Sequence, residues 1–132
     1  MPASSNFTMA KARNAASAVT KKRFVKLVAD GTDSVEMCDT GGEDAYGVAL
    51  YSVSTDEIDK GKLVSVQTDG RAIVEAVTAI TEGQYVATDS DGKANVATTG
   101  DVVLGMCDEP GGGTTGDEIS VDLSKRSGII PS

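Results

Sequence analysis

Apolar and polar residues alternate along most of this chain, and a period of two is typical of β-strands with one buried face. Glycine and aspartate interrupt the alternation at short intervals, as they do in tight turns. Ser54 and Glu57 have the spacing of a capping box, which predicts one helical turn that ends at Gly61. The alternation predicts strands over residues 24–29, 34–38, 45–53, 62–68, 71–77, 84–89, 93–98, 102–108 and 117–123. We therefore expect an all-β domain.

Two parts of the chain resemble each other, which indicates an internal repeat. The matching positions are Phe24-Val25 and Tyr85-Val86, Gly31 and Gly92, Val35 and Val96, Gly47-Val48 and Gly105-Met106, and Gly61, Val64 and Val66 with Gly116, Ile119 and Val121. We expect two copies of one β unit, over residues 23–66 and 84–121, joined by an extra strand over 71–77. Two such units can close into a small β-barrel or sandwich, which leaves no sheet edge exposed.

Two acidic turns lie between predicted strands. Asp69-Gly70 is a strong hairpin signal and predicts that strand 71–77 returns alongside strand 62–68. Asp89, Asp91 and Asn95 have spacings that suggest a calcium loop, but an EF-hand loop requires a glutamate at its twelfth position and flanking helices. Counted from Asp89, that position is Gly100. We therefore interpret residues 89–92 as the turn of a β-hairpin.

The sequence offers no recognisable catalytic constellation. Histidine is absent, which removes the commonest general base near neutral pH and the commonest metal ligand. The glycine-rich stretch at 110–117 continues into Asp117-Glu118, whereas a phosphate-binding loop requires Lys and then Ser or Thr before a helix. Neighbouring acids such as Asp108 and Glu109 fit solvated loops. We predict that the protein is not an enzyme and holds no metal and no cofactor.

The composition predicts a thin hydrophobic core. The chain has 132 residues with no Trp, two Phe and three Tyr, and valine is abundant. Such a core gains stability from a partner or from oligomerisation. Cys38 and Cys107 match no metal or redox spacing, and we expect both to be reduced and partly buried, although the sequence leaves a disulfide between them open.

Charge is distributed unevenly along the chain. Residues 1–29 contain six basic residues and no acid, whereas all twenty acids lie in residues 30–132, and the net charge is −8. This split is typical of an interaction arm ahead of an acidic body. A nucleic-acid partner is disfavoured because the acidic body would repel a polyanion. No apolar run predicts a membrane span or a secretory signal peptide, while an organelle transit peptide remains an alternative for the basic segment.

The same features predict three segments. Residues 1–22 form a basic N-terminal arm, which is either a short helix around residues 9–19, an extended arm that orders on a partner, or a frayed terminus. Residues 23–126 form the β-barrel domain. Residues 127–132 form a C-terminal tail, in which we expect Ile129 and Ile130 to dock on a surface that the sequence does not identify.

Several phrases follow one another along the chain: Gly47-Val48-Ala49, the strand and return over 64–77, Ile80, Gly83 and Val86, the Asp91-Gly92 turn, and Gly116-Asp117 with Ile119 and Val121. The order of these phrases resembles the head decoration, or capsid cement, proteins of tailed bacteriophages. The resemblance covers roughly residues 24–123 and rests on the order of phrases, because no single residue is a chemical signature. Residues 1–22 match no part of the family pattern.

This resemblance implies a structural protein that binds the outer surface of a matured phage capsid in the virion. It implies the major capsid protein as partner, a homotrimer, and stabilisation of the shell, after synthesis in the cytoplasm of the bacterial host. The residues expected to contact the capsid or a neighbour are Phe7, Met9, Lys11, Arg13, Lys21, Lys22 and Arg23. The alternatives are a β-barrel module that binds a small ligand or carbohydrate, and a hydrolase that uses acidic loops.

Overall fold

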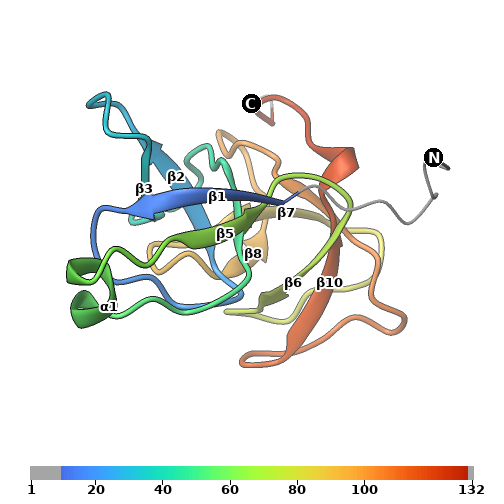
Figure 1. Cartoon of the computed structure of the whole chain (residues 1–132). Helices are drawn as coiled ribbons and strands as arrows, with labels where there is room; N and C mark the ends of the chain where they lie inside the picture. The colour runs from blue at the N-terminus through green and yellow to red at the C-terminus, as the bar shows by residue number, and fades with distance from the viewer. Residues whose placement is uncertain (1–9, 131–132) are drawn as a thin grey trace, which may run out of the picture.

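Strands dominate the computed structural model, which describes residues 10–130 (Figure 1). The strands are β1 (Ala10–Ala15), β2 (Phe24–Val28), β3 (Ser34–Met37), β4 (Gly47–Ala49), β5 (Val64–Gln67), β6 (Arg71–Glu75), β7 (Tyr85–Thr88), β8 (Ala94–Val96), β9 (Gly105–Cys107) and β10 (Glu118–Asp122). A short helix α1 (Thr55–Asp59) and a 3₁₀ turn η1 (Leu123–Lys125) complete the described elements. Each of the nine predicted strands is present, and the all-β prediction is confirmed. Across these residues no helix is long and apolar enough to cross a membrane.

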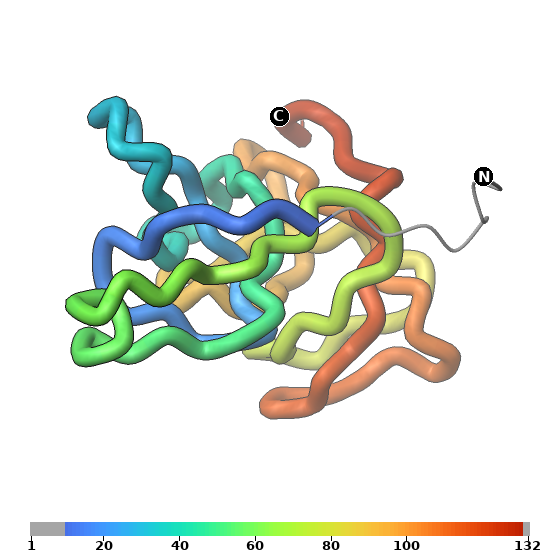
Figure 2. Tube along the Cα trace, in the orientation of Figure 1, coloured from blue at the N-terminus to red at the C-terminus, as the bar shows by residue number. Residues whose placement is uncertain are grey.

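The strands form two five-stranded units that lie side by side (Figures 1 and 2). Strands β1-β3-β2-β4-β5 close into a barrel, and the second sheet has the order β6-β10-β9-β7-β8. A parallel bridge between Ala76 and Ala94 joins the two edge strands of the second sheet. Both units therefore keep few strand edges open, which limits edge-to-edge aggregation.

The register of the strands confirms the internal repeat. In the first unit Phe24 pairs with Val48 across β2 and β4, and in the second unit Tyr85 pairs with Met106 across β7 and β9. The pairing of Ala49 with Val66 is likewise repeated by Cys107 and Val121. One alignment differs from the sequence prediction: Met37, rather than Val35, occupies the place of Val96, because the first hairpin is two residues longer.

The repeat begins earlier than the sequence analysis placed it, which corrects two predictions. Strand β1 lies between β3 and β5 and closes the first barrel, so residues 10–22 do not form a helix or an arm ahead of the domain. Strand β6 is the counterpart of β1 and is not an extra connecting strand. The shared pairing shows this, since Ala15 lies parallel to Val35 as Ala76 lies parallel to Ala94. Residues 1–9 of the predicted arm lie outside the described part of the chain.

The Asp69-Gly70 turn also differs from the prediction. Strand β5 pairs with β1 and β4, whereas β6 pairs with β10, so the turn connects the two units and is not a hairpin. The side chain of Gln67 holds this crossover, because its Nε2 donates to the carbonyl oxygens of Asp69 (2.9 Å) and Arg71 (2.8 Å). An Asp-Gly pair favours a local reversal, but the pairing of β5 with β1 decides where the next strand goes.

The Asp89–Gly92 segment is the turn of the β7–β8 hairpin, as predicted. Asp89 Oδ1 accepts hydrogen bonds from the backbone N–H groups of Asp91 (2.8 Å) and Lys93 (2.7 Å). Gly92 has φ 79°, a conformation that glycine adopts without steric cost. The Asp89 carboxylate therefore stabilises the turn. Within residues 10–130 no group of three or more His, Cys, Asp or Glu could hold a metal ion.

Two buried clusters form the core. One fills the first barrel around Val25, Val35 and Val66. The second fills the second unit and continues onto the outer side of the first, so it joins the units. Its members from the first unit are Phe24, Cys38, Ala45 and Val48. Both cysteines are buried and unpaired, and burial raises the pKa of the Cys38 thiol to about 12, which keeps it protonated.

The C-terminal segment docks through its backbone, as expected for residues 127–130. Ile129 bridges to Val102, and the N–H of Ile130 donates to the carbonyl of Asp101 (3.0 Å). The side chain of Ile129 nevertheless remains 65% exposed, so it adds little to the core.

Helix α1 begins with the predicted capping box. The N–H of Glu57 donates to Ser54 Oγ (3.2 Å), and the N–H of Ser54 donates to Glu57 Oε1 (3.0 Å). Glu57 Oε2 also pairs with Lys62 Nζ at 2.7 Å. The hydrogen bond from Lys62, followed by the one from the Ser54 backbone, lowers the pKa of Glu57 from 4.5 to about 2.

This shift predicts how acid affects stability. As the pH falls from 4.5 towards 2, the unfolded chain binds a proton at Glu57 before the folded chain does, so the stabilisation from this carboxylate is lost. We expect the difference in unfolding free energy between wild type and Glu57→Gln to shrink across this range, measured by urea unfolding. Asp59→Asn, at the end of the same helix, is the control. A difference that stays constant with pH would contradict the assignment.

Candidate functional site

The predicted contact residues lie on β1 and on the segment that leads from it to β2. Phe7 and Met9 fall outside the described residues. Lys11 and Arg13 lie on β1, and Lys21, Lys22 and Arg23 directly precede β2. Three of these five cations, Arg13, Lys22 and Arg23, form ion pairs within the chain.

Arg13 is held by other residues of the first barrel. It forms an ion pair with Asp33 and donates a hydrogen bond to Tyr46 Oη (2.8 Å). Its guanidinium also lies over the Tyr46 ring, 4.9 Å from the centroid, in a cation–π arrangement. Arg13 Nε is buried and makes no hydrogen bond within the described chain. The side chain is therefore committed to the barrel.

Arg23 fastens the two units together. Its guanidinium donates to Glu75 Oε1 on β6 (3.2 Å) and to the carbonyl of Asp91 in the β7–β8 turn (3.2 Å). Lys93 reaches the other oxygen of Glu75 at 3.4 Å. Burial alone would raise the pKa of Glu75, but Arg23 and Lys93 outweigh it and lower the pKa. The carboxylate therefore stays charged between two cations at the junction.

Lys22 occupies a strained backbone position. Its φ of 62° lies in the left-handed region, which costs a non-glycine residue about 1 kcal/mol or more. The repeat explains the position, because its counterpart is Gly83, with φ 91°, and each donates its N–H to the equivalent carbonyl, of Ala49 or Cys107. Lys22 Nζ pairs with Glu118 Oε1 at 2.8 Å, a second contact between the units.

Lys11 and Lys21 are the predicted cations that remain exposed. Neither forms an ion pair with any residue of the described range 10–130. The sequence could not separate these two from Arg13, Lys22 and Arg23, because the paired acids come from distant parts of the chain.

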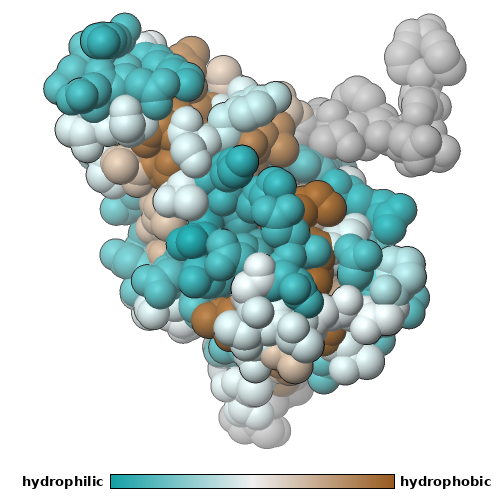
Figure 3. Space-filling view, turned by 90° about the horizontal axis from the view of Figure 1, so that it is seen from below, coloured by the Kyte–Doolittle hydropathy of each residue, from teal (hydrophilic) through white to brown (hydrophobic). Residues whose placement is uncertain are grey.

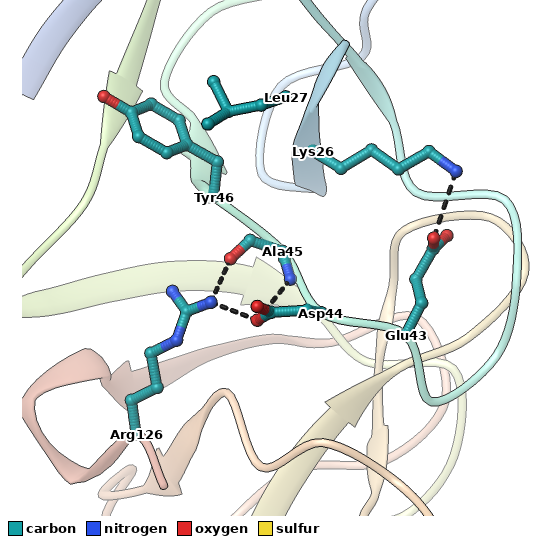
Figure 4. Close-up of a pocket in the computed structure, with 7 residues that line it drawn as sticks. All are labelled: Lys26, Leu27, Glu43, Asp44, Ala45, Tyr46 and Arg126. Atoms are coloured by element: carbon teal, nitrogen blue, oxygen red, sulfur yellow. Dashed lines mark hydrogen bonds and ion pairs between the residues drawn. The ribbon is translucent and has the colours of Figure 1, made fainter. Parts of the chain in front are cut away.

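A hollow of about 420 Å³ lies between the first barrel and the C-terminal segment (Figure 4). Its lining residues are Lys26, Leu27, Glu43, Asp44, Ala45, Tyr46 and Arg126. Figure 4 shows Tyr46 beside Leu27, while Arg126 points at Asp44 and the carbonyl of Ala45. Lys26 is held by Asp39 (2.7 Å) and Glu43 (3.0 Å), and these hydrogen bonds raise its pKa, so it stays charged.

The charges around this hollow neutralise one another, so they do not create a site for a strongly charged ligand. Its apolar part consists of Leu27, which is 50% exposed, and the ring of Tyr46. No pattern in the sequence indicates this hollow. In the sequence, the repeat shows only that Leu27 and Tyr46 occupy the places of Thr88 and Leu104, and the structure shows that both residues of the second unit are buried.

Besides Leu27 at the hollow, other large apolar residues are exposed on the surface. Figure 3 shows one face on which hydrophilic side chains separate hydrophobic areas. The residues with the largest exposure are Leu27, Tyr51, Leu63, Ile73, Tyr85 and Ile129. Tyr85 is the counterpart of Phe24, but it is 51% exposed whereas Phe24 is 1% exposed.

Comparison with solved structures identifies a similar fold in a phage head protein. The N-terminal base of head fiber gp8.5 of bacteriophage phi29 superposes with a TM-score of 0.71 at 19% sequence identity. The alignment covers 92% of this chain and 98% of that one. At this identity the match shows a shared fold. Comparison with curated proteins finds no match.

The family is shown by the sequence of the chain as a whole. Residues 2–124 match the model for structural cement proteins of the type of E217 gp24 and Pam3 gp6. Such proteins are structural components of the phage capsid and not enzymes. The resemblance in the order of phrases, which covered residues 24–123, is thereby confirmed and extended to the N-terminal residues. This chain belongs to the phage structural cement protein family, and its role is to stabilise a capsid.

Proposed function

We propose that the protein binds the outer surface of a matured phage capsid as a homotrimer, contacts the major capsid protein, and stabilises the shell. The observation that carries the proposal is the family match over residues 2–124. A protein that binds the expanded shell and not its precursor stabilises the expanded state by mass action. Many copies on one shell make weak individual contacts collectively strong.

The proposed contact uses the N-terminal residues and the exposed cations near them. Lys11 and Lys21 are free to pair with acids of the capsid surface, and Phe7 and Met9 supply apolar anchors ahead of β1. Arg13, Lys22 and Arg23 act indirectly in this proposal, because they hold the barrel and the junction between the units. Exposed ion pairs each contribute about 0.2–1 kcal/mol, so binding should weaken at high salt.

Co-sedimentation with heads that lack decoration proteins tests the proposal. We expect wild type to pellet with expanded heads up to a saturating stoichiometry and not with unexpanded precursors. The double variant Lys11→Glu/Lys21→Glu should bind roughly tenfold more weakly at low salt, since two ion pairs are lost and two repulsions are added.

A matched control separates a specific contact from net charge. Lys60→Glu/Lys125→Glu changes the net charge equally at two exposed, unpaired lysines that are not among the predicted contact residues, and it should bind as wild type does. Equal weakening in both double variants would contradict the assignment of Lys11 and Lys21. Failure of wild type to pellet with any expanded head would contradict the proposed function.

A further inference from the structure

The two units of the chain meet through a specific pair of surfaces. The first unit contributes the outer side of β2 and β4, where Phe24 and Val48 are each 1% exposed. The second unit contributes the opening of its sheet, where Val74 and Leu104 belong to the same buried cluster. The backbone joins there as well, since the N–H of Phe24 donates to the carbonyl of Gly92 (2.7 Å). We refer to these two surfaces as the outer face and the opening.

Because the chain is a repeat, each surface has a counterpart, and the described chain leaves these counterparts at least partly exposed. The outer face of the second unit carries Tyr85 in place of Phe24 and Met106 in place of Val48, and Tyr85 is 51% exposed. The opening of the first unit carries Leu27 in place of Thr88 and Tyr46 in place of Leu104. Leu27 is 50% exposed, whereas Thr88 is 1% exposed.

The partly exposed opening is also hollow. The space of about 420 Å³ lies against Leu27 and Tyr46, and Arg13 stacks on the Tyr46 ring beside it (Figure 4 shows the hollow). In the second unit the first unit covers the equivalent place. The opening of the first unit is therefore a preformed recess. The equivalent recess in the second unit is already filled by the first unit of the same chain.

The exposed outer face and the exposed opening both differ from their buried counterparts by more polar side chains. Phe24 is replaced by Tyr85 on the outer face, while Val74 and Leu104 are replaced by Arg13 and Tyr46 in the opening. Both sides have thus gained polar atoms, and Arg13 Nε lacks a partner. A tyrosine hydroxyl can pair with an arginine or with another hydroxyl, and the same polar atoms tolerate water before assembly.

We propose that the opening of the first barrel of one copy receives the Tyr85–Met106 outer face of a second copy. The partner is a second copy of this chain. Each chain already makes this contact once between its own two units, and it exposes one further outer face and one further opening. The contact is heterologous, and such contacts build closed rings when the rotation between copies closes. This inference names the interface of the homotrimer in the proposed function. It rests on the proposed function only for self-association, because it involves no contact with the capsid.

Native mass measurements on matched variants test the proposal. We expect wild type to be a homotrimer in solution, and Leu27→Glu and Tyr85→Glu each to reduce its mass to the 13.5 kDa of one chain. Leu63→Glu and Tyr51→Glu are the controls, because Leu63 is 49% exposed, close to Leu27, and Tyr51 is 63% exposed. Both controls should keep the wild-type mass. Unchanged far-UV circular dichroism verifies that every variant folds.

Mixing the two interface variants tests the head-to-tail geometry. Leu27→Glu retains an intact outer face and Tyr85→Glu retains an intact opening, so the mixture should form a 1:1 heterodimer and nothing larger. A monomeric wild type, an oligomer that survives either substitution, or a mixture without heterodimer would overturn the proposal.

Co-sedimentation with expanded heads, scored separately, distinguishes this inference from the capsid role. Folded monomeric variants that still bind the shell support the interface and leave the capsid role intact. A wild-type trimer that the two substitutions dissociate, but that binds no shell, would sustain the interface and refute the capsid role.

Discussion

Alanine at position 47 is expected to destabilise the protein by about 1–3 kcal/mol or more, a large share of the 5–15 kcal/mol typical of a domain. Gly47 begins β4 where the chain lies directly against β5. A Cβ at this position would clash with the carbonyl oxygen of Gln67 and lie 2.8 Å from Val66 Cγ1. The paired backbone of a closed barrel can shift only at a large cost in free energy, so β4 and β5 would be forced apart. Urea unfolding followed by circular dichroism, which needs no tryptophan, measures the loss.

The internal repeat supplies a second test of the same argument. Gly105 is the counterpart of Gly47, and a Cβ there would lie 2.7 Å from both the carbonyl oxygen of Asp122 and Val121 Cγ1. Gly105→Ala should therefore cost a similar amount. Gly128→Ala is the control, since a Cβ at Gly128 meets nothing within 4 Å. Near-neutral effects at both Gly47 and Gly105 would show that the close strand approach does not limit stability.

Truncation of Phe24 to alanine is expected to cost about 3–5 kcal/mol, the usual range for a buried phenylalanine. Phe24 is the largest fully buried side chain within residues 10–130 and lies where the core of the second unit meets the outer side of the first. Its removal would leave a cavity at the only place where the two units share a hydrophobic cluster among the described residues. Urea unfolding should show a lower midpoint.

Tyr51→Ala provides the comparison for this truncation. Tyr51 is 63% exposed, so its truncation should change the unfolding free energy by less than about 0.5 kcal/mol. If Phe24→Ala were as mild as Tyr51→Ala, the shared cluster would not be what joins the units.

The alternation of apolar and polar residues was sufficient to predict nine strands, because valine-rich strands with one buried face show their period directly. It was not sufficient for β1. This strand has the sequence AKARNA, and alanine, lysine and asparagine are all disfavoured in strands, so it forms because β3 and β5 both pair with it. The repeat held the missing information, in matches that the sequence analysis did not use. Ala15, Ala18 and Thr20 recur 61 residues later as Ala76, Ala79 and Thr81.

The candidate site was less predictable than the fold. A cluster of basic residues in the sequence indicates an interaction surface, but it does not show which cations are already paired. Arg23 pairs with Glu75 across 52 residues, and Lys22 pairs with Glu118 across 96 residues. Only the folded arrangement brings these acids near, so only the structure distinguishes Lys11 and Lys21 as exposed and unpaired among the described cations of the segment.

The order of the strand and turn motifs along the chain indicated the role of the protein. No motif contains a catalytic or ligand-binding group that indicates it. Strand register and turn residues such as Gly92 are requirements of the fold, and a capsid protein that works by binding leaves no catalytic signature. This is why the family match, and not a cluster of side chains, carries the functional conclusion.

We propose that this chain stabilises the expanded phage head. The most direct test is the temperature at which DNA-filled heads without decoration proteins release their DNA, measured with and without added protein. We expect the release temperature to rise with added protein and to reach a plateau when the shell is saturated. A release temperature that stays unchanged while the protein is bound at saturation would contradict the proposal.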